Sequence, residues 1–244
     1  MQCVIAPMPS SALGLTTLPE GLPSLVDRVR FDGWASSRRP TTLGLLGRID
    51  KDSWAAFGAS WDRLGADCYM ADGGRYRRRR HAVLALADGD ISLRPSRAHY
   101  QSRDYNPLNG GIARWFAQVE QATLANPVFA DLLNLCIAVL EIGTTTLEIE
   151  VHQFRIEAGL SAGHPTPEGM HRDGVDWVGI FLVARKNVEA GTTQICVDGL
   201  VDPAEFTLVD PLDAVFINDN RVLRASRQSR RKTRNRQVTA MCWF

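Results

Sequence analysis

Two side chains that could bind a metal ion, His171 and Asp173, stand two residues apart in the sequence. On an extended backbone, residues at this spacing point to the same face. A neutral imidazole and a carboxylate on one face can occupy two adjacent positions of an octahedral metal. A third ligand would complete the facial triad of non-haem Fe(II) oxygenases, which leaves positions open for a cosubstrate and O2. Because a bare His-x-Asp pair is common in surface loops, it predicts a metal site only together with its surroundings.

Four sequence blocks in a fixed order surround or accompany this pair. They are Asp72-Gly73-Gly74-Arg75-Tyr76-Arg77, then Tyr105-Asn106-Pro107 with Gly110-Gly111, then Pro165 to Asp176, then Asp210-Pro211-Leu212-Asp213 with Asp219-Asn220-Arg221-Val222. Together they resemble the small bacterial 2-oxoglutarate/Fe(II) dioxygenases that hydroxylate free L-amino acids, the isoleucine 4-hydroxylase group. The resemblance covers roughly residues 45–244.

This resemblance implies a fold, cofactors and site residues. The fold is α+β or mainly β, with a double-stranded β-helix (jelly-roll) core and N-terminal helices packed on it. The cofactors are Fe(II) and 2-oxoglutarate, which act with O2, and the substrate is a small amino-acid-like molecule. His171 and Asp173 are then the catalytic metal ligands. The expected substrate-binding residues are Arg77, Gln101, Asn106 and Arg114.

The sequence departs from the family at the third metal ligand. In the family a histidine follows the Asn-Arg-Val block, but here the matching residue is Arg224, and the five histidines all lie at or before position 171. A guanidinium stays protonated and has no lone pair to offer a metal. Three outcomes stay open: iron binds through His171, Asp173 and 2-oxoglutarate with extra water; His152 or His164 substitutes as third ligand; or metal binding is lost. We expect the Arg224 guanidinium to turn away from the metal or to be held by Asp219 or the cosubstrate.

The far carboxylate of 2-oxoglutarate needs a bidentate cation, for which arginine is suited. In the family this arginine begins the last strand. Arg236 fits that place, with Thr239 as a helper, and Arg234 is the next candidate because the surrounding arginines leave the register open.

A second run of arginines extends from residue 75 to residue 80. Alternation along a strand places Arg75, Arg77 and Arg79 on one face, and Arg78 and Arg80 on the other. The run is compatible with a solvated strand face or with nucleic-acid binding. We favour a third interpretation, in which one face lines a pocket for acidic ligands and the other is solvated.

The composition is that of an ordinary globular protein of 244 residues, 45% hydrophobic and 23% charged. A net charge of +1 gives the whole molecule no attraction for nucleic acid or membrane. The five cysteines are scattered without metal-binding or disulfide spacing. No stretch has the pattern of a signal peptide or a transmembrane segment, so we expect a cytoplasmic protein. The oligomeric state is not predicted.

The periodicity of the chain predicts helices first and strands later, in one jelly-roll domain over residues 45–244. Residues 1–44 are expected to form a partly ordered arm. Helices are predicted from Asp50 or Asp52 to about Leu64, from Arg114, and from Pro127 to near Gly143. Strands are predicted at residues 147–156, 177–184, 192–197, 206–209, 214–217, 221–225 and 237–244.

Two functions from different classes follow. The first is a 2-oxoglutarate-dependent oxygenase that hydroxylates, desaturates or cyclises a free or modified amino acid in specialised metabolism. The second is a catalytically inactive relative that binds an amino-acid-like ligand or regulates a partner. His171, Asp173 and Arg236 favour the first function, and Arg224 favours the second.

Overall fold

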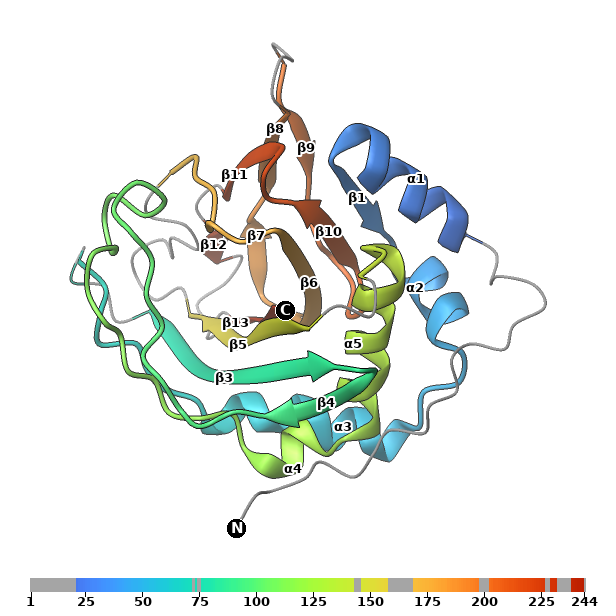
Figure 1. Ribbon diagram of the computed structural model, residues 1–244, viewed down its shortest axis with the longest axis horizontal. Coiled ribbons are helices and arrows are strands. Elements are labelled where there is room, and N and C mark those ends of the chain that lie inside the picture. Colours follow the sequence, from blue (N-terminus) through green and yellow to red (C-terminus); the bar gives the residue numbers. More distant parts are fainter. Residues whose placement is uncertain are drawn as a thin grey trace.

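The computed structural model describes residues 21–71, 73, 76–142, 146–157, 169–197, 202–226, 229–231 and 238–243. Its largest element is an eight-stranded antiparallel sheet with the order β1-β10-β6-β13-β5-β3-β2, in which β4 pairs with β3 (Figure 1). These strands are β1 Trp34–Ser37, β2 Gly65–Ala66, β3 Arg77–Ala87, β4 Asp90–Leu93, β5 Leu147–Ile156, β6 Trp177–Lys186, β10 Ala214–Asn218 and β13 Val238–Trp243.

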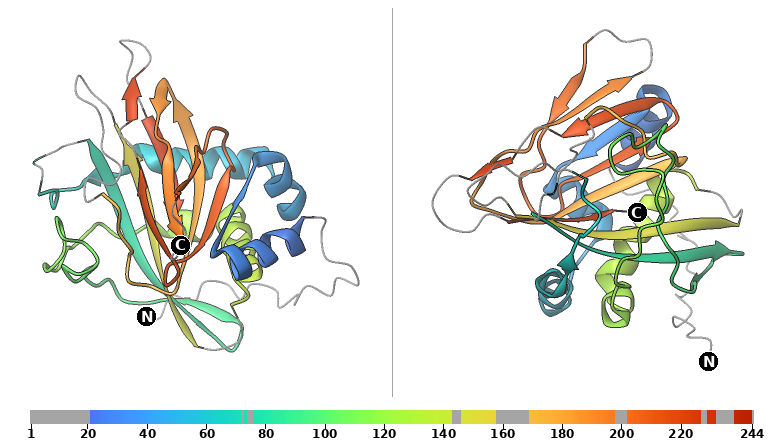
Figure 2. Two further views of the ribbon diagram at one scale, coloured as in Figure 1. Left: turned by 90° about the horizontal axis from the view of Figure 1, so that it is seen from above. Right: turned by 90° about the vertical axis from the view of Figure 1, so that its left-hand side faces the viewer.

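Two smaller antiparallel sheets accompany the large one, with the orders β11-β8-β9 and β12-β7. Their strands are β7 Val188–Ala190, β8 Thr193–Val197, β9 Ala204–Phe206, β11 Val222–Ser226 and β12 Ser229–Arg231. The three-stranded sheet faces the β6–β10 part of the large sheet (Figure 2). Apolar side chains from both sheets form the core between them: Val178, Ile180, Ile195, Val215, Ile217 and Val222. Two facing antiparallel sheets of this kind make a jelly-roll.

Helices cover the opposite face of the large sheet (Figure 2). They are α1 Leu22–Asp32, α2 Arg39–Leu46, α3 Lys51–Ala59, the 3-10 turn η1 Ser60–Arg63, α4 Gln121–Leu124 and α5 Pro127–Val139. The larger hydrophobic core lies between these helices and the sheet. At Gly179 in β6 the helix approaches so closely that a Cβ atom there would lie 2.4 Å from the Sγ atom of Cys136 in α5.

The predicted helix after Asp50 is confirmed in its start, since the Asp50 side chain accepts a hydrogen bond from the backbone N–H of Ser53. It is shorter than expected, because η1 replaces its last turn. Residues 21–44, expected as part of an arm, contain α1, β1 and the beginning of α2. Strand β1 pairs with β10 and so forms one end of the large sheet.

The helix predicted from Arg114 is wrong. This segment is extended, and its backbone bonds to its neighbours: His99 exchanges two hydrogen bonds with Arg114, and His81 in β3 bonds to Ala117 and Val119. Burial alternates accordingly, with Trp115 60% exposed and Phe116 only 9%. Trp115 and Phe116 therefore point to opposite sides of an extended chain.

One buried carboxylate organises the turn before β10. Asp213 accepts hydrogen bonds from the backbone N–H groups of Arg39, Val209 and Asp210, and from the guanidinium of Arg38. Burial would raise the pKa of Asp213, but the backbone donors outweigh burial and lower it. The carboxylate therefore joins the start of α2 to the end of the loop that leads into β10.

We expect Asp213→Asn to lower the free energy of unfolding by about 2–4 kcal/mol at neutral pH. The amide loses the charge-assisted hydrogen bonds, and its NH2 group faces backbone N–H groups that are themselves donors. Urea denaturation measures the effect, with the exposed Asp210→Asn as the matched control. Since the folded pKa lies below the unfolded one, the contribution is complete above about pH 4 and disappears as the pH falls through the folded value. An unchanged difference between variant and wild type in acid would contradict this role.

Candidate metal and substrate site

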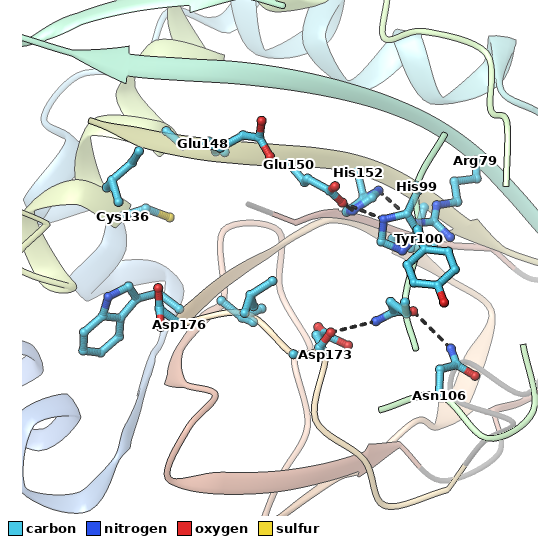
Figure 3. A pocket seen from close by; sticks show the side chains of 18 of the residues that line it. Arg79, His99, Tyr100, Asn106, Cys136, Glu148, Glu150, His152, Asp173 and Asp176 are labelled. Carbon is cyan, nitrogen blue, oxygen red and sulfur yellow. Dashed lines mark hydrogen bonds and ion pairs between the residues drawn. The ribbon is translucent and has the colours of Figure 1, made fainter. Parts of the chain in front are cut away.

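A cavity of about 440 Å³ opens between the inner face of β3 and β5 and the segment that carries His171 and Asp173. On one side, the strands contribute Arg77, Arg79, Glu150 and His152. Figure 3 shows Glu150, His152 and His99 on this side, with Asp173 opposite them. Helix α5 contributes an apolar end that includes Cys136. The cavity thus combines charges of both signs with an apolar part.

His171 and Asp173 are brought together in this cavity. The Nε2 atom of His171 lies 3.5 Å from the Oδ1 atom of Asp173. The Nδ1 atom of His171 donates to the carbonyl oxygen of Gly169 at 2.7 Å, so Nε2 carries the lone pair of the neutral ring. A metal ion about 2.1 Å from both atoms in adjacent positions would set them about 3 Å apart. The spacing in the sequence therefore places two donor atoms where one ion can contact both.

Arg224 lies directly opposite His171. The two residues form an isolated antiparallel bridge, with both backbone N–H···O distances at 3.0 Å. The guanidinium forms an ion pair with the Oδ2 atom of Asp173, and its side chain is only 4% exposed. The sequence predicts Asp219 or the cosubstrate as the partner of this cation, but the carboxylate paired with it is that of Asp173, a candidate metal ligand.

The charge of Arg224 acts on Asp173. Burial would raise the pKa of Asp173, but the charge of Arg224, together with the contacts of His171, outweighs burial and holds the pKa well below its ordinary value. For the nearby Asp219 the balance is reversed, because burial and the charge of Asp173 raise its pKa. Asp173 is therefore ionised at neutral pH, with one oxygen toward His171 and the other toward Arg224.

The four predicted substrate-binding residues all line the cavity. Arg114 donates to the Oε1 atom of Gln101 at 2.7 Å, and Asn106 donates to the same atom at 3.1 Å. The amide nitrogen of Gln101 donates in turn to the backbone oxygen of Asp173 at 3.1 Å. Three predicted residues thus form one hydrogen-bonded group that is attached to the metal-binding segment.

Arg77 and Arg79 both face the cavity, as alternation along the strand predicted. Arg77 forms a buried ion pair with Asp67 at 2.7 Å, and its Nη2 atom has no hydrogen-bond partner among the described residues. Arg79 lies between the rings of Phe116 and Phe154, at 4.1 and 4.6 Å. On the other face, Arg78 and Arg80 pair with glutamates, so that face is not simply solvated.

Several predicted residues fall outside the described part of the chain. These are Arg234, Arg236 and His164, together with Arg75. Thr239 lies in β13, where its backbone pairs with Ile156 and Arg185. The 2-oxoglutarate anchor on the last strand therefore stays a prediction.

His152, the candidate substitute ligand, lines the cavity, and its two ring nitrogens face different groups. Arg79 donates to Nδ1 at 2.9 Å, while Nε2 lies 3.4 Å from the Oε2 atom of Glu150. Burial, and then the charge of Arg79, lower the pKa of His152 well below its ordinary value. His81, His99 and Glu150 surround it, and the sequence analysis assigned a site role to none of these three.

The sequence matches the family described as 2OG-Fe dioxygenase over residues 58–239. The chain belongs to the 2OG-Fe dioxygenase family. It is accordingly an oxidoreductase of the class that uses Fe(II) and 2-oxoglutarate, as the resemblance implied. No curated protein matches the sequence. No helix in the described residues is both long and apolar enough to cross a bilayer.

Solved structures confirm the jelly-roll fold. A bsmA homolog from Methylobium petroleophilum PM1 has 29% sequence identity and a TM-score of 0.81, over 92% of this chain and 93% of that one. IDO from Bacillus thuringiensis gives a TM-score of 0.75 at 14% identity, over 94% and 96%. The Fe(II)/α-ketoglutarate-dependent dioxygenase TqaL gives 0.66 at 16% identity, over 91% and 85%. The last two likenesses concern the fold alone.

The residues at the family's metal position fit iron only in part. His171 Nε2 and Asp173 Oδ1 have suitable donor chemistry and spacing. Beside these two atoms lies the guanidinium of Arg224, which repels a metal cation and already binds the other carboxylate oxygen. This position therefore offers two protein ligands beside a fixed positive charge.

Proposed function

We propose that this member of the 2OG-Fe dioxygenase family oxidises a free or modified amino acid in specialised metabolism, by hydroxylation, desaturation or radical ring closure. The observation that carries the proposal is the cavity itself. It is small, it has charges of both signs, and it contains guanidinium N–H groups of Arg77 and Arg79 that have no hydrogen-bond partner among the described residues. Unpaired buried donors are costly, and an acidic group of a ligand would satisfy them.

An amino acid has features that this cavity complements. Its carboxylate can accept from a guanidinium such as that of Arg114, which Gln101 holds in place. Its ammonium group can approach Glu148 or Asp176, whose side chains line the same cavity. Its side chain can reach the apolar end beside Cys136. Molecules with both charges and a short apolar part are therefore favoured over purely acidic or purely apolar ones.

Each group of the chain has a role in this proposal. When bound, Fe(II) and 2-oxoglutarate supply the oxidant for an unactivated C–H bond. His171 and Asp173 present two donor atoms to the metal, and the Gly169 carbonyl keeps the lone pair of His171 on Nε2. Gln101 accepts hydrogen bonds from Arg114 and Asn106 and donates one to the Asp173 backbone. It therefore connects the expected substrate-binding residues to the metal-binding segment.

The test is succinate formation from 2-oxoglutarate by the Fe(II)-loaded protein with each L-amino acid in turn. We expect one amino acid, or one group with similar side chains, to stimulate succinate formation. Arg114→Gln should raise the KM for that amino acid by about 10- to 100-fold, as expected for losing one charge-assisted hydrogen bond. The control is Arg63→Gln, which removes the cation of the exposed ion pair between Arg63 and Glu120. Succinate formation that responds to no amino acid would contradict the proposed substrate class.

The Arg224–Asp173 ion pair favours a second candidate, an inactive relative that binds an amino-acid-like ligand or regulates a partner. The two functions differ in an anaerobic Fe(II) titration with 2-oxoglutarate. An oxygenase develops a metal-to-ligand charge-transfer band, whereas the inactive relative binds the amino acid but shows neither the band nor succinate formation.

A further inference from the structure

Three imidazoles and one carboxylate converge on a single point beside the family's metal position. The Oε2 atom of Glu150 lies 2.6 Å from His99 Nδ1, 3.4 Å from His152 Nε2 and 3.5 Å from His81 Nε2. One ligand atom from each of the four residues can be chosen so that all four lie within 4.8 Å of one another. Ligand atoms about 2.1 Å from a common metal ion must lie within about 4.2 Å of one another, so only small side-chain shifts separate this cluster from a metal site.

The backbone fixes the positions of these residues. His81 in β3 and His152 in β5 are direct cross-strand partners, and their rings stack at 4.7 Å with an interplanar angle of 17°. Glu150 precedes His152 by two residues and therefore points to the same face. His99 is held by its two backbone hydrogen bonds to Arg114. Donors that are supplied by paired strands are already assembled before any ion arrives.

One member of the cluster lacks a partner that a ligand would supply. The Nε2 atom of His81 is buried and has no hydrogen-bond partner among the described residues, and the whole residue is only 3% exposed. Its nearest acceptor, Glu150, is at 3.5 Å, which is too long for a good hydrogen bond. An unsatisfied buried polar atom costs about 1–3 kcal/mol. A metal ion between His81 and Glu150 would contact both.

The contact with Arg79 makes His152 a weaker metal ligand than the other three residues. Because the guanidinium donates to Nδ1 of His152, the proton of neutral His152 lies on Nε2, toward Glu150. His152 must give up this proton to bind a metal and is the weakest donor. The Nδ1 atom of His99 faces Glu150 at 2.6 Å, and its other ring nitrogen can carry the proton when a metal binds at Nδ1. His81, His99 and Glu150 are then a two-histidine, one-carboxylate set.

We propose that His81, His99 and Glu150, with His152 as a fourth donor, bind a divalent transition-metal ion at a site separate from His171 and Asp173. Two or three imidazoles with one carboxylate suit Fe(II), Co(II) and Zn(II) rather than Mg(II) or Ca(II). Arg97 pairs with Glu148 and also reaches the Oε1 atom of Glu150, so the Oε2 atom of Glu150 is left facing the three imidazoles. The inference does not depend on the proposed amino-acid substrate.

The alternative is a cluster that shares protons and binds no metal. In that arrangement the three imidazoles face the Oε2 atom of Glu150, with His99 as a hydrogen-bond donor at 2.6 Å, and together they outweigh burial to hold the pKa of Glu150 far below its ordinary value. The alternative explains the ionised carboxylate but leaves His81 Nε2 without a good partner. Metal binding accounts for both features.

Cobalt titration of the metal-free protein, without 2-oxoglutarate, tests the proposal. We expect one equivalent of Co(II) to bind and to give the visible absorption of a nitrogen- and oxygen-coordinated ion, with equilibrium dialysis giving the stoichiometry. His81→Gln and Glu150→Gln should each weaken binding at least about 100-fold. His171→Gln, the same chemical change at the family position, is the matched control and should leave this equivalent in place.

Thermal melts establish that each variant is folded. Crystals of the wild-type protein soaked with Co(II) provide a measurement that needs no variant, because the anomalous peak must lie among His81, His99 and Glu150. The proposal is overturned if wild type binds no Co(II), if His171→Gln removes the bound equivalent while His81→Gln keeps it, or if the anomalous peak lies between His171 and Asp173.

Discussion

His171→Ala and Asp173→Ala are each expected to abolish succinate formation, because each removes one of the two protein donors that the described residues bring together at the family's metal position. Asp173→Ala has a second expected effect. It deprives the buried Arg224 guanidinium of its ion-pair partner, and removing one member of a buried pair costs about 3–5 kcal/mol of stability. Succinate assays with amino-acid substrate measure the first effect, and urea denaturation measures the second.

A double variant separates these two effects. Asp173→Ala combined with Arg224→Leu removes both charges and should recover most of the lost stability, because no buried charge is left unpaired. It should not recover turnover. Near wild-type succinate formation in either single variant would show that His171 and Asp173 are not the catalytic metal ligands.

Arg224→His is expected to tighten Fe(II) binding at the family position by about 10- to 100-fold or more, a range that changes around a metal site commonly reach. The substitution removes a repulsion that amounts to roughly 4 kcal/mol for two unit charges at about 4 Å in a dielectric near 20. It also adds a neutral imidazole directly across from His171, because the backbones of residues 171 and 224 are paired.

The measurement is an anaerobic Fe(II) titration followed by the charge-transfer band with 2-oxoglutarate. A His81→Gln background removes the second donor set, so that only the family position contributes. Arg224→Lys, which keeps the positive charge, is the control and should not tighten binding. Equal iron affinities for the histidine variant and its parent would show that residue 224 does not face the metal.

The parts of this site that local sequence could predict are those that depend on spacing along one strand or on an ordered motif. His171 and Asp173 share one face because they are two residues apart, and Arg77 and Arg79 do so for the same reason. The position of Arg224 followed from the order of the family's blocks. For the two pairs, the residues and the spacing that predicts their shared face lie in one short stretch of chain.

The second donor set could not be found in this way. His81 and His152 are 71 positions apart, and only the register of β3 against β5 makes them neighbours. Period-two alternation along β5 places Glu150 and His152 on one face, but it does not indicate which strand lies beside them. His99 depends on the extended segment around Arg114, which the sequence wrongly indicated as helix because tertiary pairing overrode local propensity.

The close approach of α5 to β6 has a consequence for what the cavity can admit. Gly179 leaves no room for a larger side chain because Cys136 lies against it, and the same helix forms the apolar end of the cavity. Part of the apolar wall of the cavity is therefore built from outside the jelly-roll, by residues of one helix. Substitutions on α5 can thus change the size of molecule that this cavity accepts, without altering any strand that carries the polar groups.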